Sequence, residues 1–266
     1  MYKRQIYDDL ADTTTDLTET VDPDAVAIPS TSTVTVTLKE MGNTVIPTLK
    51  LRTLTLSDID PAVANIVARN QASSVDTRVQ NVLKAGTQVC YSNAGAPDTT
   101  GPTNTLTTGD VFKAAIPRTL VAKMRGDSVV EKMSDNTFAG FIHPDVAYDF
   151  RAETGEVGWR YPHNNVAPQN LWLEQVGVFG GVSWIESPRC YTATDGLSSK
   201  AVYRSYILGA QALAEVVAIE PHLIIGPTVD PMMRFRPLSW YGLAGWSIYR
   251  QEALWRVETV SSIDTF

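Results

Sequence analysis

The sequence is poor in the residues that most metal sites and nucleophilic sites require. It has two cysteines, Cys90 and Cys190, and three histidines, His143, His163 and His222, which lie at least twenty residues apart. No HxxxH, HxH or CxxC spacing occurs, although zinc ligands usually come in such pairs. The GxSxG motif of serine hydrolases is also missing. The sequence therefore predicts no catalytic residue, no metal site and no cofactor.

Long apolar runs and clusters of one charge are missing too. The longest apolar stretches, such as Ala212–Ile219, which Glu215 interrupts, are too short to cross a membrane. Asp8 and Asp9 stand where a signal peptide needs its apolar core. The formal net charge is −7, and lysine and arginine form no run. A protein that binds nucleic acid specifically usually has a continuous basic surface. A membrane partner and specific nucleic-acid binding are both disfavoured.

What remains is the composition of a globular protein. Hydrophobic residues make up 44% and charged residues 19% of the 266 residues, which is enough chain for one large domain or two smaller ones. Two distant cysteines indicate thiols in a reducing cytoplasm, so assembly inside a cell is expected. A mildly acidic balance also suits a protein that lines a DNA-filled space and contacts the DNA without specificity.

The first five residues, MYKRQ, resemble the translation of a transposon-based sequencing adapter read from a GTG start. An ordinary basic N-terminus is the alternative. On the adapter interpretation, residues upstream are missing and the fold should not be argued from residues 1–5.

Residues 12–46 have the pattern of an exposed β-structure. Residues 12–32 are rich in Thr, Asp, Ser and Pro, and residues 33–38 alternate strictly between threonine and an apolar residue. This period of two places Val34, Val36 and Leu38 on one face of a half-buried strand. Gly42-Asn43 offers a bend or bulge before strand character resumes. We expect an extended β-arm over residues 16–56.

A long helix follows the arm. Asp60 has the features of an N-cap and Pro61 those of the first helical residue. An apolar stripe continues to Leu83, and Gly86 provides the stop, which predicts a helix over Pro61–Ala85 of roughly 37 Å. Polar Asn70 and Ser74 interrupt the stripe, so the middle of the helix is expected to face another subunit.

The rest of the chain predicts short alternating elements. A loop rich in Gly, Pro, Thr and Asn over 92–109 indicates a domain boundary or surface excursion. The expected elements are a helix near 108–123 kinked at Pro117, a strand over 138–143, a helix over 144–152 capped near His143, a loop over 164–170, a hairpin or bulged pair over 171–185 around Gly177, Gly180 and Gly181, a helix over 201–219, and two strands over 240–262.

Several short motifs follow one another between residues 17 and 262. They are Leu17-Thr18-Glu19, Val34–Asn43, Lys50-Leu51-Arg52, Asp58–Pro61, Phe141–Pro144, Asp149–Arg151, Gly177–Val182, Glu186-Ser187, Gly209–Leu213, Asp230-Pro231, Gly245-Trp246 and Arg256–Ser262. In this order they resemble the N4-type major capsid protein family of tailed phages. Met41 departs from the family, which usually has an aromatic residue there. Family members also carry several tens of residues before the Leu-Thr-Glu motif, which agrees with an N-terminal truncation.

The resemblance implies an α+β, HK97-like fold and a non-enzymatic shell subunit that assembles into pentamers and hexamers around double-stranded DNA. It divides the chain into 1–15, a remnant of an N-terminal arm; 16–56, the arm or E-loop that reaches over a neighbour; 57–91, a peripheral domain with the spine helix; 92–225, an axial domain; and 226–266, returning strands of the peripheral domain. Portal, scaffold and decoration proteins are further expected partners.

Contacts between subunits are expected at the arm, the spine helix and a basic pair near Asp230. The residues predicted to make them are Val34, Val36, Leu38, Lys39, Glu40, Lys50, Asn70, Arg234 and Arg236. Arg234 and Arg236 could instead clamp an anion. A covalent Lys–Asn crosslink, as in related phages, is not expected from Lys39, Lys50 and Asn43.

Two other functions stay open at this stage. One is an encapsulin-like shell of cellular origin with the same fold, which neighbouring genes would distinguish from a phage protein. The other is an enzyme with an unrecognised site, which would be active on substrate and would form no particles.

Overall fold

The longest helix among the described residues is α2 (Ile59–Leu83). The computed structural model describes residues 1–7, 10, 12–14, 16–17, 19–20, 22, 25–27, 31–55, 59–128, 130–153 and 175–263. With 25 residues, α2 is about 37 Å long. The helix expected over 61–85 is confirmed, displaced by two residues at each end. Asp60 lies inside the first turn instead of capping it, and Gly86 N–H donates to the Leu83 carbonyl at 3.1 Å.

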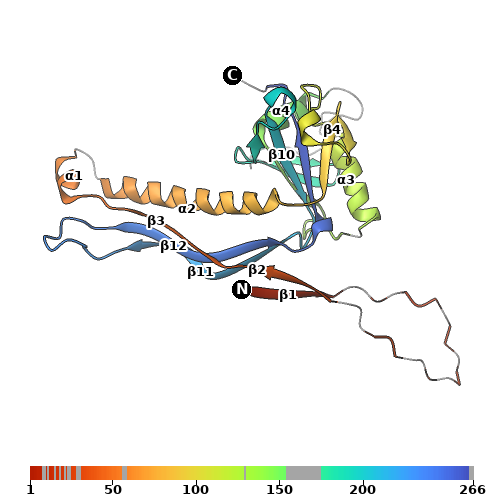
Figure 1. The fold of residues 1–266 in the computed structure, drawn as a ribbon, viewed down its shortest axis with the longest axis horizontal. Helices are drawn as coiled ribbons and strands as arrows, with labels where there is room; N and C mark the ends of the chain where they lie inside the picture. Colours follow the sequence, from red (N-terminus) through yellow and green to blue (C-terminus); the bar gives the residue numbers. More distant parts are fainter. Residues whose placement is uncertain are drawn as a thin grey trace.

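One side of α2 packs on a three-stranded antiparallel sheet in the order β11-β12-β3. Its strands are β3 (Lys39–Val45), β11 (Leu213–Ile225) and β12 (Leu238–Ile248). A small core of Met41, Val63, Val67, Trp240 and Ala244 joins the helix to the sheet. We call α2 with this sheet the blade (Figure 1). A short helix, α1 (Leu49–Leu54), lies at its far end.

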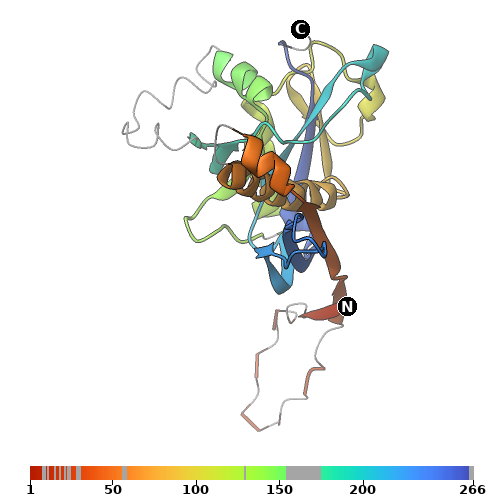
Figure 2. The same ribbon diagram turned by 90° about the vertical axis from the view of Figure 1, so that its left-hand side faces the viewer.

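A two-stranded ribbon leaves the blade. It consists of β1 (Tyr2–Tyr7) and β2 (Thr31–Val36), paired antiparallel. Val34 is half-buried, Val36 is buried, and Thr33 and Thr35 are exposed, which confirms the alternation expected in this strand. The ribbon lies at the edge of the blade, on the side away from the rest of the molecule (Figures 1 and 2).

The expected single arm over 16–56 is wrong in its second half. β3 runs through Gly42 and Asn43 without a register shift and pairs with β12. Glycine permits the close approach of the two strands, because a Cβ at Gly42 would come within 2.6 Å of the Trp240 carbonyl oxygen. Residues 49–54 form α1, capped by Thr48, whose hydroxyl accepts from Leu51 N–H at 3.2 Å. Residues 2–7, which include four of the five suspected adapter residues, form β1; the origin of residues 1–5 stays a prediction.

The other body of the molecule is built on an eight-stranded mixed sheet. Its order is β5-β4-β13-β10-β6-β8-β7, with β9 added beside β10. Helices α3 (Ala115–Gly126) and α4 (Pro144–Ala152) belong to it. The strands are β4 (Val89–Asn93), β5 (Ala96–Asp98), β6 (Phe138–Ile142), β7 (Gln175–Phe179), β8 (Val182–Glu186), β9 (Thr192–Ala193), β10 (Val202–Leu208) and β13 (Leu254–Thr259), and the 3-10 turns are η1 (Thr103–Thr105), η3 (Leu197–Ser199) and η4 (Gln251–Ala253).

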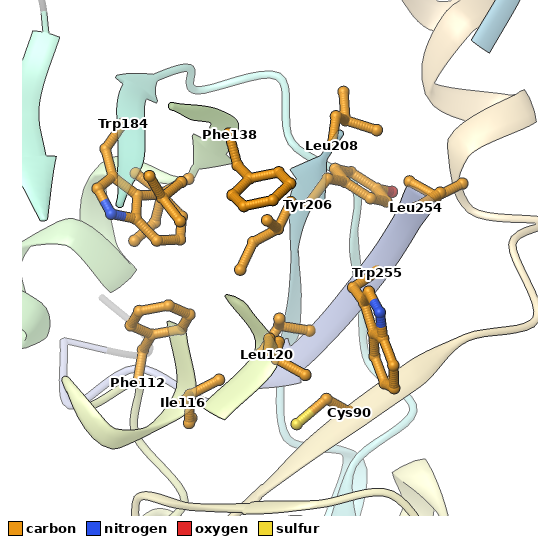
Figure 3. Packing of buried hydrophobic residues seen from close by; sticks show 14 of the residues in the cluster. Cys90, Phe112, Ile116, Leu120, Phe138, Trp184, Tyr206, Leu208, Leu254 and Trp255 are labelled. Atoms are coloured by element: carbon orange, nitrogen blue, oxygen red, sulfur yellow. The ribbon is translucent and has the colours of Figure 1, made fainter. Parts of the chain in front are cut away.

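The main hydrophobic core lies in this body. Trp184, Phe138, Tyr206 and other fully buried side chains fill the space between the sheet and its helices (Figure 3). Phe112 contacts Phe150 edge-on, with ring centroids 5.1 Å apart, and Trp184 at 5.5 Å. These edge-to-face contacts are the arrangement that aromatic rings prefer.

Several short predicted elements are confirmed. β6 and α4 lie at the expected residues, and His143 caps α4 by accepting from Asp145 N–H at 3.2 Å. β7 and β8 form the expected hairpin with a register shift between Gln175 and Gly177. Two strands, β12 and β13, occupy the C-terminal stretch. The loop expected at 164–170 and residues 171–174 lie outside the described residues.

The helix expected over 201–219 is wrong. The segment forms β10, a turn at Gln211 with φ of +60°, and the start of β11. β10 lies in the interior of the sheet between β6 and β13. A nearly continuous apolar strand buried on both faces has no period of two, so its pattern cannot be told from that of a buried helix.

One further expectation needs correction. α3 begins at Ala115, so Pro117 lies in its first turn, where a missing N–H is tolerated, and does not kink a longer helix.

The strand pairing separates segments that lie close in the sequence: β11 joins the blade, and β13 pairs with β10 and β4 in the larger sheet. Long-range pairing of this kind leaves no local signal in the sequence. The division into axial and peripheral domains stays a prediction.

Candidate functional site

The far end of the blade exposes a patch of large apolar side chains. α1 is tied to the connection between β11 and β12, because Leu49 N–H donates to the Arg234 carbonyl at 2.9 Å and Thr48 bridges Phe235. We call this patch the tip surface. Its residues are Ile46, Leu49, Leu51, Leu54, Ile225, Val229, Met232 and Met233, all between 46% and 71% exposed. Contiguous exposed apolar patches mark sites of interaction with other molecules.

Charged residues flank the tip surface. Arg234 forms an ion pair with Asp230 and lies over the Phe235 ring at 5.3 Å. The hydrogen bond from Arg234 lowers the pKa of the Asp230 carboxyl. Arg236 is exposed and lines a hollow of about 320 Å³ beside Leu223. The structure therefore brings together three predicted contact residues, Lys50, Arg234 and Arg236, but Arg234 is already engaged by a carboxylate, which disfavours a two-arginine anion clamp.

Sequence reasoning missed most of the tip surface. Leu49 and Leu51 alternate with polar residues in LKLRTL as in a strand, and only the tertiary structure shows that these residues form a helix without a buried side chain. Met232-Met233 beside Val229 in a Pro-rich turn is the one signal that was present, since large apolar residues are unusual in exposed turns.

The ribbon is anchored where β2 crosses β12. Val36 is 2% exposed, and a Cβ on Gly245 of β12 would overlap the Thr37 carbonyl oxygen and approach Val36 Cγ1 to 3.1 Å. Arg4 of β1 lies over the Tyr249 ring at 4.8 Å. Val36 and the half-buried Leu38 therefore fasten the ribbon to its own chain, and their contact with a neighbour stays a prediction.

A groove opens beside this anchor, between α2 and the blade sheet. We call it the basic groove. It encloses about 750 Å³ and is lined by Thr37, Lys39, Ser73, Ser74, Thr77, Arg78, Asn81, Val82, Ala244, Gly245 and Trp246. Lys39 shares the inner face of β3 with the buried Met41, and Glu40 points to the opposite, exposed face. Lys39 and Glu40, both predicted contact residues, therefore lie on opposite faces of the sheet.

Asn70 is engaged within the chain. Its Oδ1 accepts from Trp240 Nε1 at 2.9 Å and from Asn43 Nδ2 at 3.4 Å. Asn70, which interrupts the apolar stripe of α2, thus hydrogen-bonds with residues of the blade sheet. An inter-subunit role for Asn70 stays a prediction.

An ionic cluster, also missed from the sequence, joins the blade to the larger body. Fully buried Glu258 accepts from Arg204 Nε at 3.0 Å and from Thr103 Oγ1 at 2.6 Å, and Arg256 Nε lies 2.9 Å away. Arg256 also donates to the carbonyls of Lys84 and Gly86, just past the end of α2. A cation is stabilised at a helix C-terminus by the helix dipole. Arg256 and Glu258, two residues apart on β13, share a face, which was readable once the strand was predicted.

Arg189 makes a second connection between the two bodies. It pairs with Asp76 and donates to the Ser73 hydroxyl at 3.0 Å and the Ser73 carbonyl at 2.9 Å. Thr77 Oγ1 also accepts from it at 2.9 Å. Arg189 therefore fixes residues 73–77 of α2 to the larger body.

The nucleophile and ligand candidates have ordinary structural roles. Burial raises the pKa of the Cys90 thiol to about 11 and that of Cys190 to about 12, so both are protonated at neutral pH. Burial lowers the pKa of His143, which caps α4. Within the described ranges, no three His, Cys, Asp or Glu side chains gather as a metal site would need. The helices described there are also too short or too polar to span a bilayer.

Comparison with known proteins points in one direction. Residues 49–228 match the profile of a family described as "Phage capsid protein". A search of curated protein sequences gave no significant match. The chain is similar in structure to the cyanophage Pam1 capsid, with a TM-score of 0.71, 14% identity and coverage of 99% of this chain and 85% of that one. It is also similar to the capsid of Helicobacter pylori bacteriophage KHP30, with a TM-score of 0.70, 13% identity and coverage of 97% of this chain and 84% of that one. For the capsid of Ralstonia phage GP4 the TM-score is 0.66 and the identity 11%, with coverage of 87% of this chain and 76% of that one.

Proposed function

We propose that this chain, which belongs to the phage capsid protein family and has an HK97-like α+β fold, builds the icosahedral head of a tailed bacteriophage from pentamers and hexamers of itself. Its place is the virion, and the head would enclose double-stranded DNA. Within the family we assign it to the N4-type group, on the ordered motifs from Leu17 to Ser262.

The observation that carries the proposal is the tip surface at the end of a projecting blade. Eight large apolar side chains there are about half to three-quarters exposed, although the same chain buries a large aromatic core elsewhere. An isolated globular protein gains nothing from this exposure, and it promotes aggregation. Repetition of the chain in a closed shell covers such surfaces with identical neighbours.

The parts of the molecule suggest a division of labour. We assign the larger body to the axial positions of pentamers and hexamers, the blade to the peripheral contacts between them, and the ribbon to contacts with an adjacent subunit. The blade is joined to the larger body near the end of α2, by Arg189, by the Glu258 cluster and by Leu83, Leu213 and Ile248 at the main core. Limited bending of a stiff blade would let one chain occupy both ring sizes.

A structural role is favoured over an enzymatic one, because both thiols are buried and protonated and His143 serves as a cap. An encapsulin-like shell is the second candidate that the fold allows, but the family match to phage capsid proteins favours the phage. Portal, scaffold and decoration proteins are the expected partners of such a head, and DNA would be contacted without specificity.

The proposal is tested by electron microscopy and sedimentation of the purified chain, alone and with the scaffold or portal encoded nearby. Closed particles of one size are expected with these partners, and poor assembly is expected of the chain alone. The double change Leu54→Glu and Met233→Glu on the tip surface should abolish them and leave the circular dichroism spectrum unchanged. Met233→Leu, which keeps the surface apolar, is the matched control and should assemble. Unimpaired particles from the double variant, or no particles under any condition, would overturn the proposal.

A further inference from the structure

A hollow of about 320 Å³ lies at the far end of the blade, between the start of α2, the end of β11 and the start of β12 (Figure 1). We call it the blade hollow. Small-molecule pockets range from about 300 to 1,000 Å³, so it is large enough for a small ligand. Proline, valine, alanine, leucine and isoleucine side chains form most of its wall. A pocket with such a wall binds a ligand that is mainly apolar.

Two apolar side chains of this wall are exposed although they lie on the face of the sheet that α2 covers. Leu223 of β11 pairs with Trp240 of β12, and Ile225 pairs with Leu238. Residues that pair directly across antiparallel strands share a face, and both Trp240 and Leu238 belong to the core between α2 and the sheet. Leu223 is nonetheless 43% and Ile225 57% exposed. Within the described ranges, the chain leaves this end of the blade core uncovered.

The polar residues of the blade hollow include one cation that the chain does not neutralise. Arg52 is paired with Asp60, whose Oδ1 lies 2.9 Å from the Arg52 Nε. Arg236 is exposed, and it has no ion-pair or hydrogen-bond partner among the described residues. A guanidinium group can bind a carboxylate through two parallel hydrogen bonds. The blade hollow therefore combines an apolar wall with a binding position for one anionic group.

We propose that the blade hollow binds an amphipathic monocarboxylate, a molecule with one carboxylate and a linear alkyl tail, such as decanoate. The carboxylate pairs with Arg236, and the tail covers Leu223 and Ile225 beside the start of α2. The bound tail joins α2 to β11 and stiffens the far end of the blade. The inference goes beyond the proposed function and does not depend on it, because a single unassembled chain carries every lining residue.

Other classes of ligand fit the blade hollow less well. A phosphate monoester carries nearly two negative charges, whereas Arg236 is the one lining cation without a carboxylate partner in the described part of the chain. An alkyl ammonium ion is repelled by the same arginine. An uncharged alkyl alcohol keeps the contacts with the apolar wall but cannot form the ion pair, which makes it a useful comparison.

Calorimetric titration of the unassembled protein with decanoate, octanoate and decanol, each within its range of monomeric solubility, tests the proposal. Decanoate is expected to bind at one site per chain, about fifteen times more tightly than octanoate, because each of its two additional methylene groups contributes about fourfold. Arg236→Ala should weaken decanoate binding about three- to fivefold, the effect of an exposed ion pair, and leave decanol binding unchanged. Arg236→Lys should keep most of the affinity. Arg69→Ala, at an exposed position of α2 outside the blade hollow, is the control.

A second variant fills the blade hollow without removing a charge. Ala64 is half-buried in its wall, so Ala64→Phe should abolish the binding of both decanoate and decanol. Ala62→Phe is the matched control. Ala62 is exposed two residues away on the same helix and hence on a different face, so this variant should bind both ligands like the unaltered chain. Circular dichroism checks that each variant folds.

The outcomes are independent of particle formation. No binding of decanoate to the unaltered chain, or binding that Ala64→Phe leaves unchanged, overturns the inference. An equal loss of decanoate and decanol binding in Arg236→Ala overturns the assignment of the carboxylate to this arginine. The proposed function stands in each of these cases, and failure of the chain to form particles would leave the measured binding unaffected.

Discussion

The indole Nε1 of Trp240 donates a hydrogen bond to Asn70 Oδ1 at 2.9 Å, across the core that joins α2 to its sheet. Trp240 is 2% exposed, so its N–H has no access to bulk water. The polar residue that interrupts the apolar stripe of α2 therefore satisfies a buried donor of the same chain.

Replacement of Asn70 by alanine should destabilise the chain by about 1–3 kcal/mol, since it leaves the Trp240 N–H buried and unpaired. Urea unfolding of the unassembled protein measures the change. Asn81→Ala, at an exposed position of the same helix, is the control and should have little effect. If Asn70→Ala instead blocked assembly at unchanged stability, Asn70 would be a contact between subunits after all.

Neutralising the buried carboxylate of the ionic cluster should be more damaging. Glu258→Gln leaves the guanidinium groups of Arg204 and Arg256 close together without their shared carboxylate, and breaking a buried pair costs about 3–5 kcal/mol. Chemical denaturation is the measurement, with the exposed Glu131→Gln as control. A loss below about 1 kcal/mol would show that the cluster is solvated and does not hold the blade to the larger body.

Stability should fall at alkaline pH. Burial raises the pKa of Cys190 from 9.0 to about 12 and that of Cys90 to about 11, so the unfolded chain loses these protons first. The stabilisation is fully present below pH 9 and is lost as the pH rises through the folded values. Cys190→Ala should flatten the fall in melting temperature between pH 9 and the highest pH at which the protein survives. An unchanged slope in this variant and in Cys90→Ala would contradict the assignment.

The anchor of the ribbon depends on the absence of a side chain at one position. Gly245→Ala should push β2 away from β12, since the new Cβ would overlap the Thr37 carbonyl oxygen. Faster trypsin cleavage at the adjacent Lys39 and reduced particle formation are expected. Gly126→Ala is the matched control, because nothing lies within 4 Å of a Cβ there, and it should be silent in both assays. Unchanged cleavage in Gly245→Ala would show that the ribbon is not fixed at this crossing.

Local signals in the sequence were sufficient for the elements that organise themselves. The long apolar stripe with Asp60 and Pro61 predicted α2, His143-Pro144 predicted the start of α4, and the glycines of 177–181 predicted the turn between β7 and β8. Helix caps, glycine turns and the helical period depend on interactions between residues close in the chain, so a short stretch of sequence is enough to predict them.

The structure places some of the expected contact residues side by side, and their contact with a neighbour stays a prediction. Lys50, Arg234 and Arg236 do lie together, but the apolar residues around them in the tip surface were not predicted. Exposure of an apolar side chain depends on what the rest of the chain places over it, and within the described ranges α1, Met232 and Met233 are left exposed. The sequence shows that the residues of the tip surface are apolar, but it does not show whether they are exposed.

The sequence by itself determined the long helix α2 and the alternating strand at residues 33–38. It also showed that histidines and cysteines do not occur at the spacing of a known metal or catalytic motif. Only the tertiary structure decided that residues 201–219 are strands, that β11 and β13 join different sheets, and that Asn70 and Glu258 are satisfied inside the chain. Strand pairing and burial are set by contacts between residues far apart in the chain. β10 is a strand because β6 and β13 pair with its two edges, and neither pairing can be read from its own residues.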